Sequence, residues 1–199
     1  MSEIRIPTQK RSIEKRNKII EKGFELMCEK GYYNTNTVQI AKYAEVSTGI
    51  IYQYFNDKKE IFIEGVKEYS NSILYPVVDA LKNNKIDINN LDIILENIID
   101  EFVKKHTISK KAHAELMAME HLDEDVAEIF KNSEINITKN IVSLLEENNI
   151  HLENAYEKIH IAYGIIDNLC HEIVYHQHDL MNYDIMKKEV INIIKNIIK

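Results

Sequence analysis

Apolar side chains recur along the chain at the three- and four-residue spacing of amphipathic helices. Between residues 12 and 30, Ile20, Phe24 and Met27 share one helical face, and Gly31 follows as a stop signal. The same periodicity continues over most of the remaining sequence. The pattern therefore predicts an all-α protein whose first helix covers residues 12–30.

Two short helices are expected next, because two helix-start signals lie close together. Asn36 precedes Gln39 by three residues, which is the spacing of a capping box and predicts a helix that begins near Thr37. Its apolar face would consist of Val38, Ile40, Ala41 and Ala44. After a short interruption, Ser47 is the expected N-cap of a third helix at about residues 48–54. A supporting helix followed by two short helices with a three-residue turn between them is typical of a helix-turn-helix DNA reader.

The third helix divides into two faces on a helical wheel. One face carries Ile51 and Phe55, together with Ser47, and can anchor the helix on a core. The opposite face, which would project outward, consists of Gly49, Ile50, Tyr52 and Gln53. Further along the chain, the periodicity predicts longer helices at about residues 58–82, 89–106, 109–121, 123–148, 153–179 and 183–198.

The formal net charge of −7 hides a difference between the two parts of the chain. Residues 1–67 carry a net charge of +3, whereas residues 68–199 carry −10. Seven basic side chains lie within the first 22 residues: Arg5, Lys10, Arg11, Lys15, Arg16, Lys18 and Lys22. Because a polyanion is bound through lysine and arginine, only the first third of the chain is suited to face one. The alternative is a solvated helix face beside a polar tail.

Residues 38–62, VQIAKYAEVSTGIIYQYFNDKKEIF, resemble the signature of the TetR family of bacterial transcriptional regulators. The shared features are an Ile-Ala helix, a Val-Ser turn, a small-Gly pair, a Tyr-x-x-Phe motif and a Lys-Glu helix start, within residues 13–62. The resemblance implies an all-helical homodimer. Its N-terminal helix-turn-helix domain with a basic arm would be residues 1–57, and its helical ligand-binding and dimerisation domain would be residues 58–199. Such a protein binds a palindromic operator on double-stranded DNA and is released by a small-molecule effector, most often as a repressor.

The resemblance and the helical wheel together indicate which residues contact DNA: Thr37, Thr48, Gly49, Ile50, Tyr52, Gln53, Tyr54 and Lys58. Thr37, Tyr52 and Lys58 match family positions that meet phosphates, although Thr37 would also serve as a simple helix cap and Tyr52 could be partly buried. The small Gly49 permits close approach to the duplex. Base reading is expected from the remaining four residues.

The expected operator is rich in A·T pairs. Lys42 is the only basic residue between Thr37 and Phe55, so the third helix lacks the arginine that commonly reads guanine. Ile50 would contact thymine methyl groups, and Thr48 and Gln53 would donate or accept hydrogen bonds. Arg11 and Arg16 would reach a flanking minor groove or phosphates.

The expected effector pocket lies in helices that resemble the pocket-forming helices of the family, with mixed apolar and polar walls. Its candidate residues are His106, His113, Met117, His121, Tyr163, Asp167 and Cys170. Each of them also has a plain alternative as a core or surface residue. Glu172 and His176 are spaced i, i+4, with His171 and His178 nearby, so a metal- or haem-responsive regulator is an alternative, but we assign no metal ligand and no cofactor.

Other functional classes are disfavoured by missing motifs. The sequence contains no GxSxG, P-loop, GxGxxG or HExxH motif, so an enzyme is not expected. It has no apolar run of 18 residues and no apolar signal segment, so we expect a cytoplasmic protein without a membrane partner. Cys28 and Cys170 stand alone and are expected to be small buried residues. A DNA-binding regulator without a small-molecule effector is a further alternative.

Overall fold

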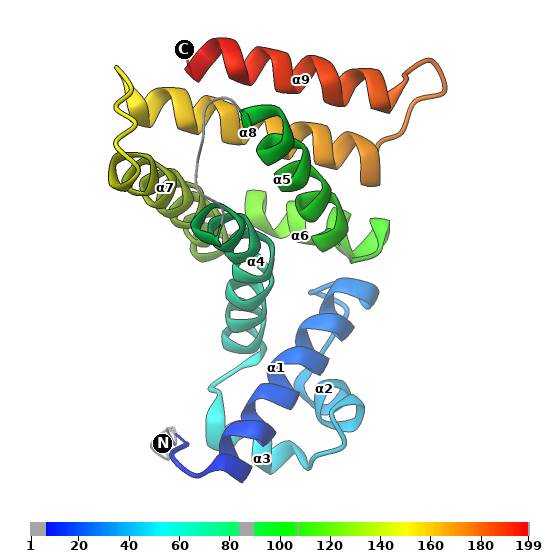
Figure 1. The fold of residues 1–199 in the computed structure, drawn as a ribbon. Helices are drawn as coiled ribbons and strands as arrows, with labels where there is room; N and C mark the ends of the chain where they lie inside the picture. Colours follow the sequence, from blue (N-terminus) through cyan, green and yellow to red (C-terminus); the bar gives the residue numbers. More distant parts are fainter. Residues whose placement is uncertain (1–6, 84–89, 107, 199) are drawn as a thin grey trace. The chain divides into compact units, whose positions relative to one another are not determined.

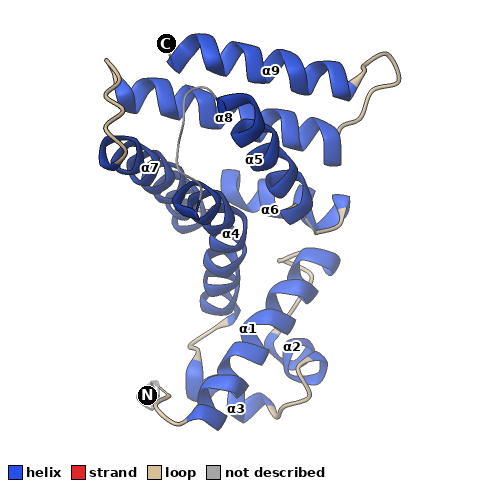
Figure 2. Ribbon diagram, viewed as in Figure 1, coloured by secondary structure: helices blue, strands red, loops and turns tan. Residues whose placement is uncertain are grey.

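The computed structural model describes residues 7–83, 90–106 and 108–198, and these residues form nine helices and no strand (Figures 1 and 2). The helices are α1 (Lys10–Lys30), α2 (Thr37–Tyr43), α3 (Thr48–Tyr54), α4 (Lys58–Asn83), α5 (Leu91–Lys105), α6 (Lys110–Leu122), α7 (Glu124–Glu147), α8 (Ala155–Val174) and α9 (Tyr183–Ile198). The predicted all-α class is confirmed. No helix among the described residues combines the length and the apolar character that crossing a membrane requires.

The helix boundaries agree with the predicted ranges to within two residues, except at the end of α8. This helix ends at Val174 and not at residue 179. The N–H groups of Tyr175 and His176 both donate to the carbonyl of His171, at 2.8 and 3.2 Å, and close the last turn. Tyr175 is buried in the fold. Neither glycine nor proline marks this end, so the periodicity of the sequence did not reveal it.

Local capping explains where the short helices begin. The predicted capping box is present at α2: the side chain of Asn36 accepts from the N–H of Gln39 at 3.0 Å, and the side chain of Gln39 accepts from the N–H of Asn36 at 2.9 Å. Helix α3 begins directly after Ser47 as predicted, but the side chain of Ser47 makes no capping hydrogen bond. At α4, Asp57 Oδ1 accepts from the N–H of Glu60 at 3.0 Å.

The chain packs as two compact units. Of the described residues, 7–69 and 108–130 form the first unit, and 70–83, 90–106 and 131–198 form the second. This grouping differs from the predicted division after residue 57, because α6 and the first part of α7 pack in the same core as α1, α2 and α3. The assignment of DNA binding to residues 1–57 and of regulation to residues 58–199 stays a prediction.

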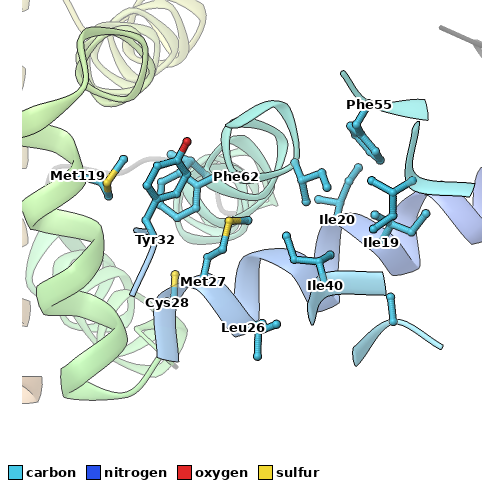
Figure 3. Packing of buried hydrophobic residues seen from close by; sticks show 14 of the residues in the cluster. Ile19, Ile20, Leu26, Met27, Cys28, Tyr32, Ile40, Phe55, Phe62 and Met119 are labelled. Carbon is cyan, nitrogen blue, oxygen red and sulfur yellow. The ribbon is translucent and has the colours of Figure 1, made fainter. Parts of the chain in front are cut away.

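The core of the first unit brings α1 together with α2, α3, α4 and α6 (Figure 3). Its largest fully buried side chains include Ile19, Ile20, Met27, Ile40, Ile51, Phe55, Phe62, Leu116 and Met119. Cys28 is also buried there, as the sequence predicts. At about 1.5–3 kcal/mol for each large apolar side chain removed from water, this core is the main stabilising contribution to the unit.

The second unit is built around α5, α8 and α9, with parts of α4 and α7. Helices α8 and α9 run antiparallel and in contact, and α5 packs against both of them (Figure 1). Its buried apolar residues include Leu95, Ile98, Phe102, Ile137, Ile159, Ile166, Leu169 and Ile194. The same two terminal helices also carry exposed apolar residues: Tyr156, Ile161, Ile185 and Ile193.

The close approach of α1 and α4 gives a test of the packing. A Cβ added at Gly65 would overlap the side chain of Phe24, so we expect Gly65→Ala to lower the free energy of unfolding by about 1–3 kcal/mol. Gly164 in α8 is a matched control, because nothing lies within 4 Å of a Cβ built there. Gly164→Ala should raise the free energy of unfolding by up to about 1 kcal/mol through helix propensity. Urea unfolding followed by circular dichroism measures both variants, and equal changes would contradict the close contact.

Candidate functional site

Helices α2 and α3 are held in place by buried contacts with the first core. Ile40 of α2 and Ile51 of α3 are completely buried, and Phe55, directly after α3, is almost completely buried. The predicted inner face of the third helix, Ile51 with Phe55, is therefore confirmed. These anchors orient the opposite face of α3 away from the core.

The turn between α2 and α3 is formed by a left-handed residue and a short backbone link. Glu45 has a φ of 56°, which reverses the chain direction. The N–H of Val46 then donates to the carbonyl of Ala41 at 2.9 Å. The carboxylate of Glu45 pairs with Lys18 of α1 at 2.6 Å and ties the turn to the supporting helix. The structure therefore contains the helix, turn and helix that the sequence predicts.

The outer face of α3 is small, polar and accessible. Gly49, Tyr52 and Gln53 are exposed, and a Cβ built on Gly49 would meet nothing within 4 Å. Thr48 and Ile50 are only partly exposed, and Ile50 packs against the first core. Six of the predicted DNA-contacting residues thus belong to α3, and three of them, Gly49, Tyr52 and Gln53, are exposed.

Two residues predicted to contact phosphates lie side by side. The hydroxyl of Thr37 at the start of α2 is 3.0 Å from the phenol oxygen of Tyr52 in α3. Tyr52 is 48% exposed, so about half of its surface is accessible and the other half is covered. This hydrogen bond connects the start of α2 to the outer face of α3, so the two form one continuous surface.

Tyr54 does not lie on this surface. It is only 6% exposed and belongs to the first core, which corrects the expectation that it contacts bases. The physical reason is its position: on a helical wheel it falls about 60° from the completely buried Ile51, on the inner half of the helix.

The expectation that Lys58 contacts a phosphate is also corrected, because its ammonium group is directed inward. The Nζ atom donates to the carbonyls of Tyr32 and Thr35 at 2.6 and 2.8 Å, and it lies 4.3 Å from the ring centre of Tyr32. Burial lowers the pKa of this lysine. Lys58 therefore fastens the segment that precedes α2 to the start of α4, and its ammonium is not presented on the surface for a phosphate.

Val38 lies on the surface and not on the apolar face of α2 that the helical pattern predicts. It was expected on the apolar face of the second helix with Ile40 and Ala41, but it is 62% exposed next to Thr37. A helical wheel separates Val38 from Ile40 by about 200°, so a stricter use of the wheel would have found it.

Some of the basic residues near the N-terminus form ion pairs within the protein. Arg16 contacts the carboxylate of Glu64 at 2.7 Å and lies 5.1 Å from the ring centre of Phe55, so it supports the core. Arg11 is exposed. Arg5 lies outside the described residues. Of the two arginines expected to reach DNA, Arg11 is the more accessible.

The segment with this geometry matches a known family. The model for "Bacterial regulatory proteins, tetR family" matches residues 19–64, which include most of α1, all of α2 and α3, and the start of α4. The helix-turn-helix segment of this chain is therefore of the TetR type.

Two curated proteins are similar to this chain over limited segments. The HTH-type transcriptional regulator HbdR of Aromatoleum sp. (strain CIB) is 50% identical over 54 residues, which is 27% of this chain and 24% of HbdR. The fatty acid metabolism regulator protein of Bacillus subtilis (strain 168) is 26% identical over 98 residues, or 49% of this chain and 50% of that protein. The matched segments thus span at most half the length of either relative.

The fold of the whole chain resembles solved TetR-family structures. A crystal structure described as a TetR-family transcriptional regulator from Mesorhizobium loti has a TM-score of 0.75, with 95% of this chain and 97% of that chain covered. At 14% sequence identity, this likeness shows a shared fold.

The seven residues expected at an effector pocket are divided between the two packing units. His113, Met117 and His121 lie on α6 in the first unit, where they are buried, partly buried and exposed, respectively. The remaining four lie in the second unit: His106, Tyr163, Asp167 and Cys170. The second unit therefore holds the larger share of the predicted site.

An apolar cavity lies inside the second unit. Its volume is about 80 Å³, measured as the space open to the centre of a water molecule. The described side chains that line it are aliphatic or aromatic and come mainly from α5, α7, α8 and α9. Tyr163 is the one residue of the predicted pocket that contributes to this lining. The cavity wall is therefore less polar than the predicted mixture of apolar and polar residues.

The other three predicted residues of the second unit are mostly shielded from water beside this cavity. His106 and Cys170 are buried, and Asp167 is partly buried. Burial raises the pKa of Asp167 to about 6, lowers the pKa of His106 and raises the pKa of the Cys170 thiol. His171, which the sequence marked only as a neighbour of Glu172 and His176, lies next to His106 and Asp167.

The contrast between two neighbouring tyrosines tests the geometry of α3. We expect Tyr54→Ala to lower the free energy of unfolding by about 3–5 kcal/mol, because it removes a buried ring from the core. Tyr52→Ala is the control and should cost no more than about 1 kcal/mol, since it removes an exposed ring and one hydrogen bond. Chemical unfolding of both variants measures the difference. A larger loss for Tyr52→Ala would show that the two faces of α3 are reversed.

Proposed function

We propose that this chain is a TetR-family protein that regulates transcription by binding a palindromic operator as a homodimer and that a small-molecule effector releases it. The role is one of binding rather than catalysis, in keeping with relatives named as regulators. In the usual mode of such proteins, DNA binding represses the adjacent gene.

The observation that carries the proposal is the outer face of α3. Gly49 leaves open space at its centre, Gln53 projects from it, and the Tyr52–Thr37 hydrogen bond joins it to the start of α2. A helix of this kind fits the major groove when its side chains near the duplex are small and its neighbours carry hydroxyl groups for phosphates.

The proposed mode of base reading follows from the side chains on that face. Gln53 would pair with adenine, and the exposed part of Ile50 would meet a thymine methyl group. Val38, exposed beside Thr37, adds a second apolar contact at the edge of the same surface. With no arginine on α2 or α3, A·T pairs are favoured under the helix.

A homodimer is supported by the apolar surface of the second unit. Ile161 of α8 and Ile185 and Ile193 of α9 are roughly half exposed, although large apolar side chains favour burial. Pairing of these two helices with the same helices of a second chain would bury them as a four-helix interface. Two α3 helices related by that axis would meet half-sites about 34–36 Å apart, or a multiple of that distance.

The effector proposed from the cavity is an amphiphile with a hydrocarbon chain. The cavity lining is apolar among the described residues, so an alkyl or acyl chain fits it better than a charged or sugar-like group. The similarity to a regulator of fatty acid metabolism in B. subtilis agrees with this class. A polar head group would have to lie outside the apolar lining.

DNA reading is tested with duplexes selected by the purified protein from a random pool. We expect Gln53→Ala to weaken binding to the selected duplex by about 5–150-fold, because one bidentate base contact is lost. Gly49→Leu should abolish specific binding by holding α3 away from the groove. Gln177→Ala, which removes an exposed glutamine in the second unit, should bind like the parent chain. Fluorescence anisotropy at fixed salt measures all four proteins.

Two results would contradict this reading. One is a selection that returns no common sequence at low salt, which would remove the regulator proposal. The other is a selected site with G·C pairs under α3, which would leave DNA binding intact but overturn the proposed mode of base reading.

The effector class is tested by thermal unfolding with long-chain fatty acids and acyl thioesters. A bound effector raises the melting temperature by mass action. Ala162→Met extends a side chain into the cavity and should reduce this shift while DNA affinity is retained. Ala114→Met, at an exposed position of α6, is the matched control and should respond like the parent. If no acyl compound shifts the parent protein, the effector is of another class or the regulator acts without one.

A further inference from the structure

Three side chains with metal-ligating atoms meet inside the second unit. His106 directly follows α5, while Asp167 and His171 lie four residues apart on one face of α8. One nitrogen or oxygen atom from each residue lies within 4.8 Å of those from the other two. Among the described residues, these three side chains form the one group of histidine, cysteine or acidic residues whose ligand atoms are close enough to surround an ion.

The hydrogen bond of His106 leaves one of its ring nitrogens with a lone pair that can bind a metal ion. Its Nδ1 atom lies 2.7 Å from the carbonyl oxygen of Phe102. Because a carbonyl only accepts, Nδ1 carries the proton and donates it, which leaves Nε2 as the acceptor. Metal-binding histidines typically use one ring nitrogen in this way and coordinate through the other. The ring of His106 packs edge-on against His171, with ring centres 5.1 Å apart.

The contact between Asp167 and His171 is looser than a good hydrogen bond. Asp167 Oδ2 is 3.5 Å from His171 Nδ1, beyond the usual range of 2.7–3.2 Å. Both side chains are about 30% exposed or less, so water solvates them only in part. A cation with ligand bonds of about 2.0–2.2 Å would draw both atoms to itself and compensate the carboxylate charge.

We propose that His106, Asp167 and His171 bind one divalent transition metal ion of the Zn²⁺ type. Two imidazole nitrogens and one carboxylate oxygen suit Zn²⁺, Fe²⁺, Co²⁺ or Ni²⁺, whereas Mg²⁺ and Ca²⁺ prefer a shell of oxygen atoms. With three protein ligands, a fourth position stays open for water or another ligand.

The ion would connect the end of α5 to the C-terminal half of α8. These two helices also line the apolar cavity: Phe102 lies one turn before His106, and Ile166 precedes Asp167. Metal binding would therefore restrain the same two helices that an acyl effector would have to accommodate. The metal site does not depend on the DNA-binding proposal or on the effector class.

The test is metal titration of the full chain, purified without a histidine tag and treated with a chelator that is then removed. Isothermal titration with Zn²⁺ should show one ion per chain. Titration with Co²⁺ should produce the visible absorption bands of a protein-bound ion with nitrogen and oxygen ligands. Asp167→Asn and His171→Gln should each weaken Zn²⁺ affinity at least tenfold. Circular dichroism verifies that each variant is folded, and either variant alone suffices for the test.

Glu172 and His178 supply the matched control. They form a second histidine–carboxylate pair near the end of α8, with Nε2 and Oε2 3.5 Å apart. The double variant Glu172→Gln, His178→Gln should bind Zn²⁺ like the parent chain. The proposal is overturned if the parent binds no Zn²⁺ stoichiometrically, or if the control variant loses the ion while Asp167→Asn and His171→Gln keep it. Equal affinity in all variants also overturns it, because the ion would then be held by other residues.

Discussion

The surface proposed to read DNA depends on burial of a few apolar side chains beneath it. Helices α2 and α3 have seven residues each, and isolated helices of that length are not stable in water. Ile40, Ile51 and Phe55 provide the stability that the short helices lack, because they are almost completely removed from solvent against α1. The orientation of Gly49, Tyr52 and Gln53 is thus set by the core on the opposite side of α3.

Polar contacts then complete the positioning of this surface. Lys58 binds two carbonyls of the segment before α2, and the capping box of Asn36 and Gln39 fixes where α2 begins. Thr37 is held at the point where its hydroxyl meets Tyr52. The lysine that the family resemblance placed against a phosphate thus stabilises the position of a neighbouring contact. Its partly buried ammonium is satisfied within the protein, so phosphate contacts would depend more on hydroxyl groups and on exposed residues such as Arg11.

In the second unit, the same pair of helices, α5 and α8, carries both apolar cavity-lining side chains and a group of side chains with metal-ligating atoms. An apolar cavity lies between side chains of α5, α7, α8 and α9, and the His106–Asp167–His171 group lies where α5 ends beside α8. A hydrocarbon chain and a metal ion are recognised by opposite physical means, burial of apolar area and coordination by lone pairs. Because both would act on the spacing of α5 and α8, either ligand offers a way to bias the conformation of this unit.

The sequence by itself determined the helical class, nearly all helix boundaries, the capping box and the inner face of α3, because these depend on residues within a few positions of one another. Only the tertiary structure showed that Tyr54 is buried, that Lys58 turns inward, that α6 belongs to the first core, and that His106 meets two residues more than sixty positions away. Helical periodicity reports which face of one helix is apolar. It carries no information on which distant helix covers that face, and the partner decides whether a polar group binds another part of the chain or is presented to a ligand.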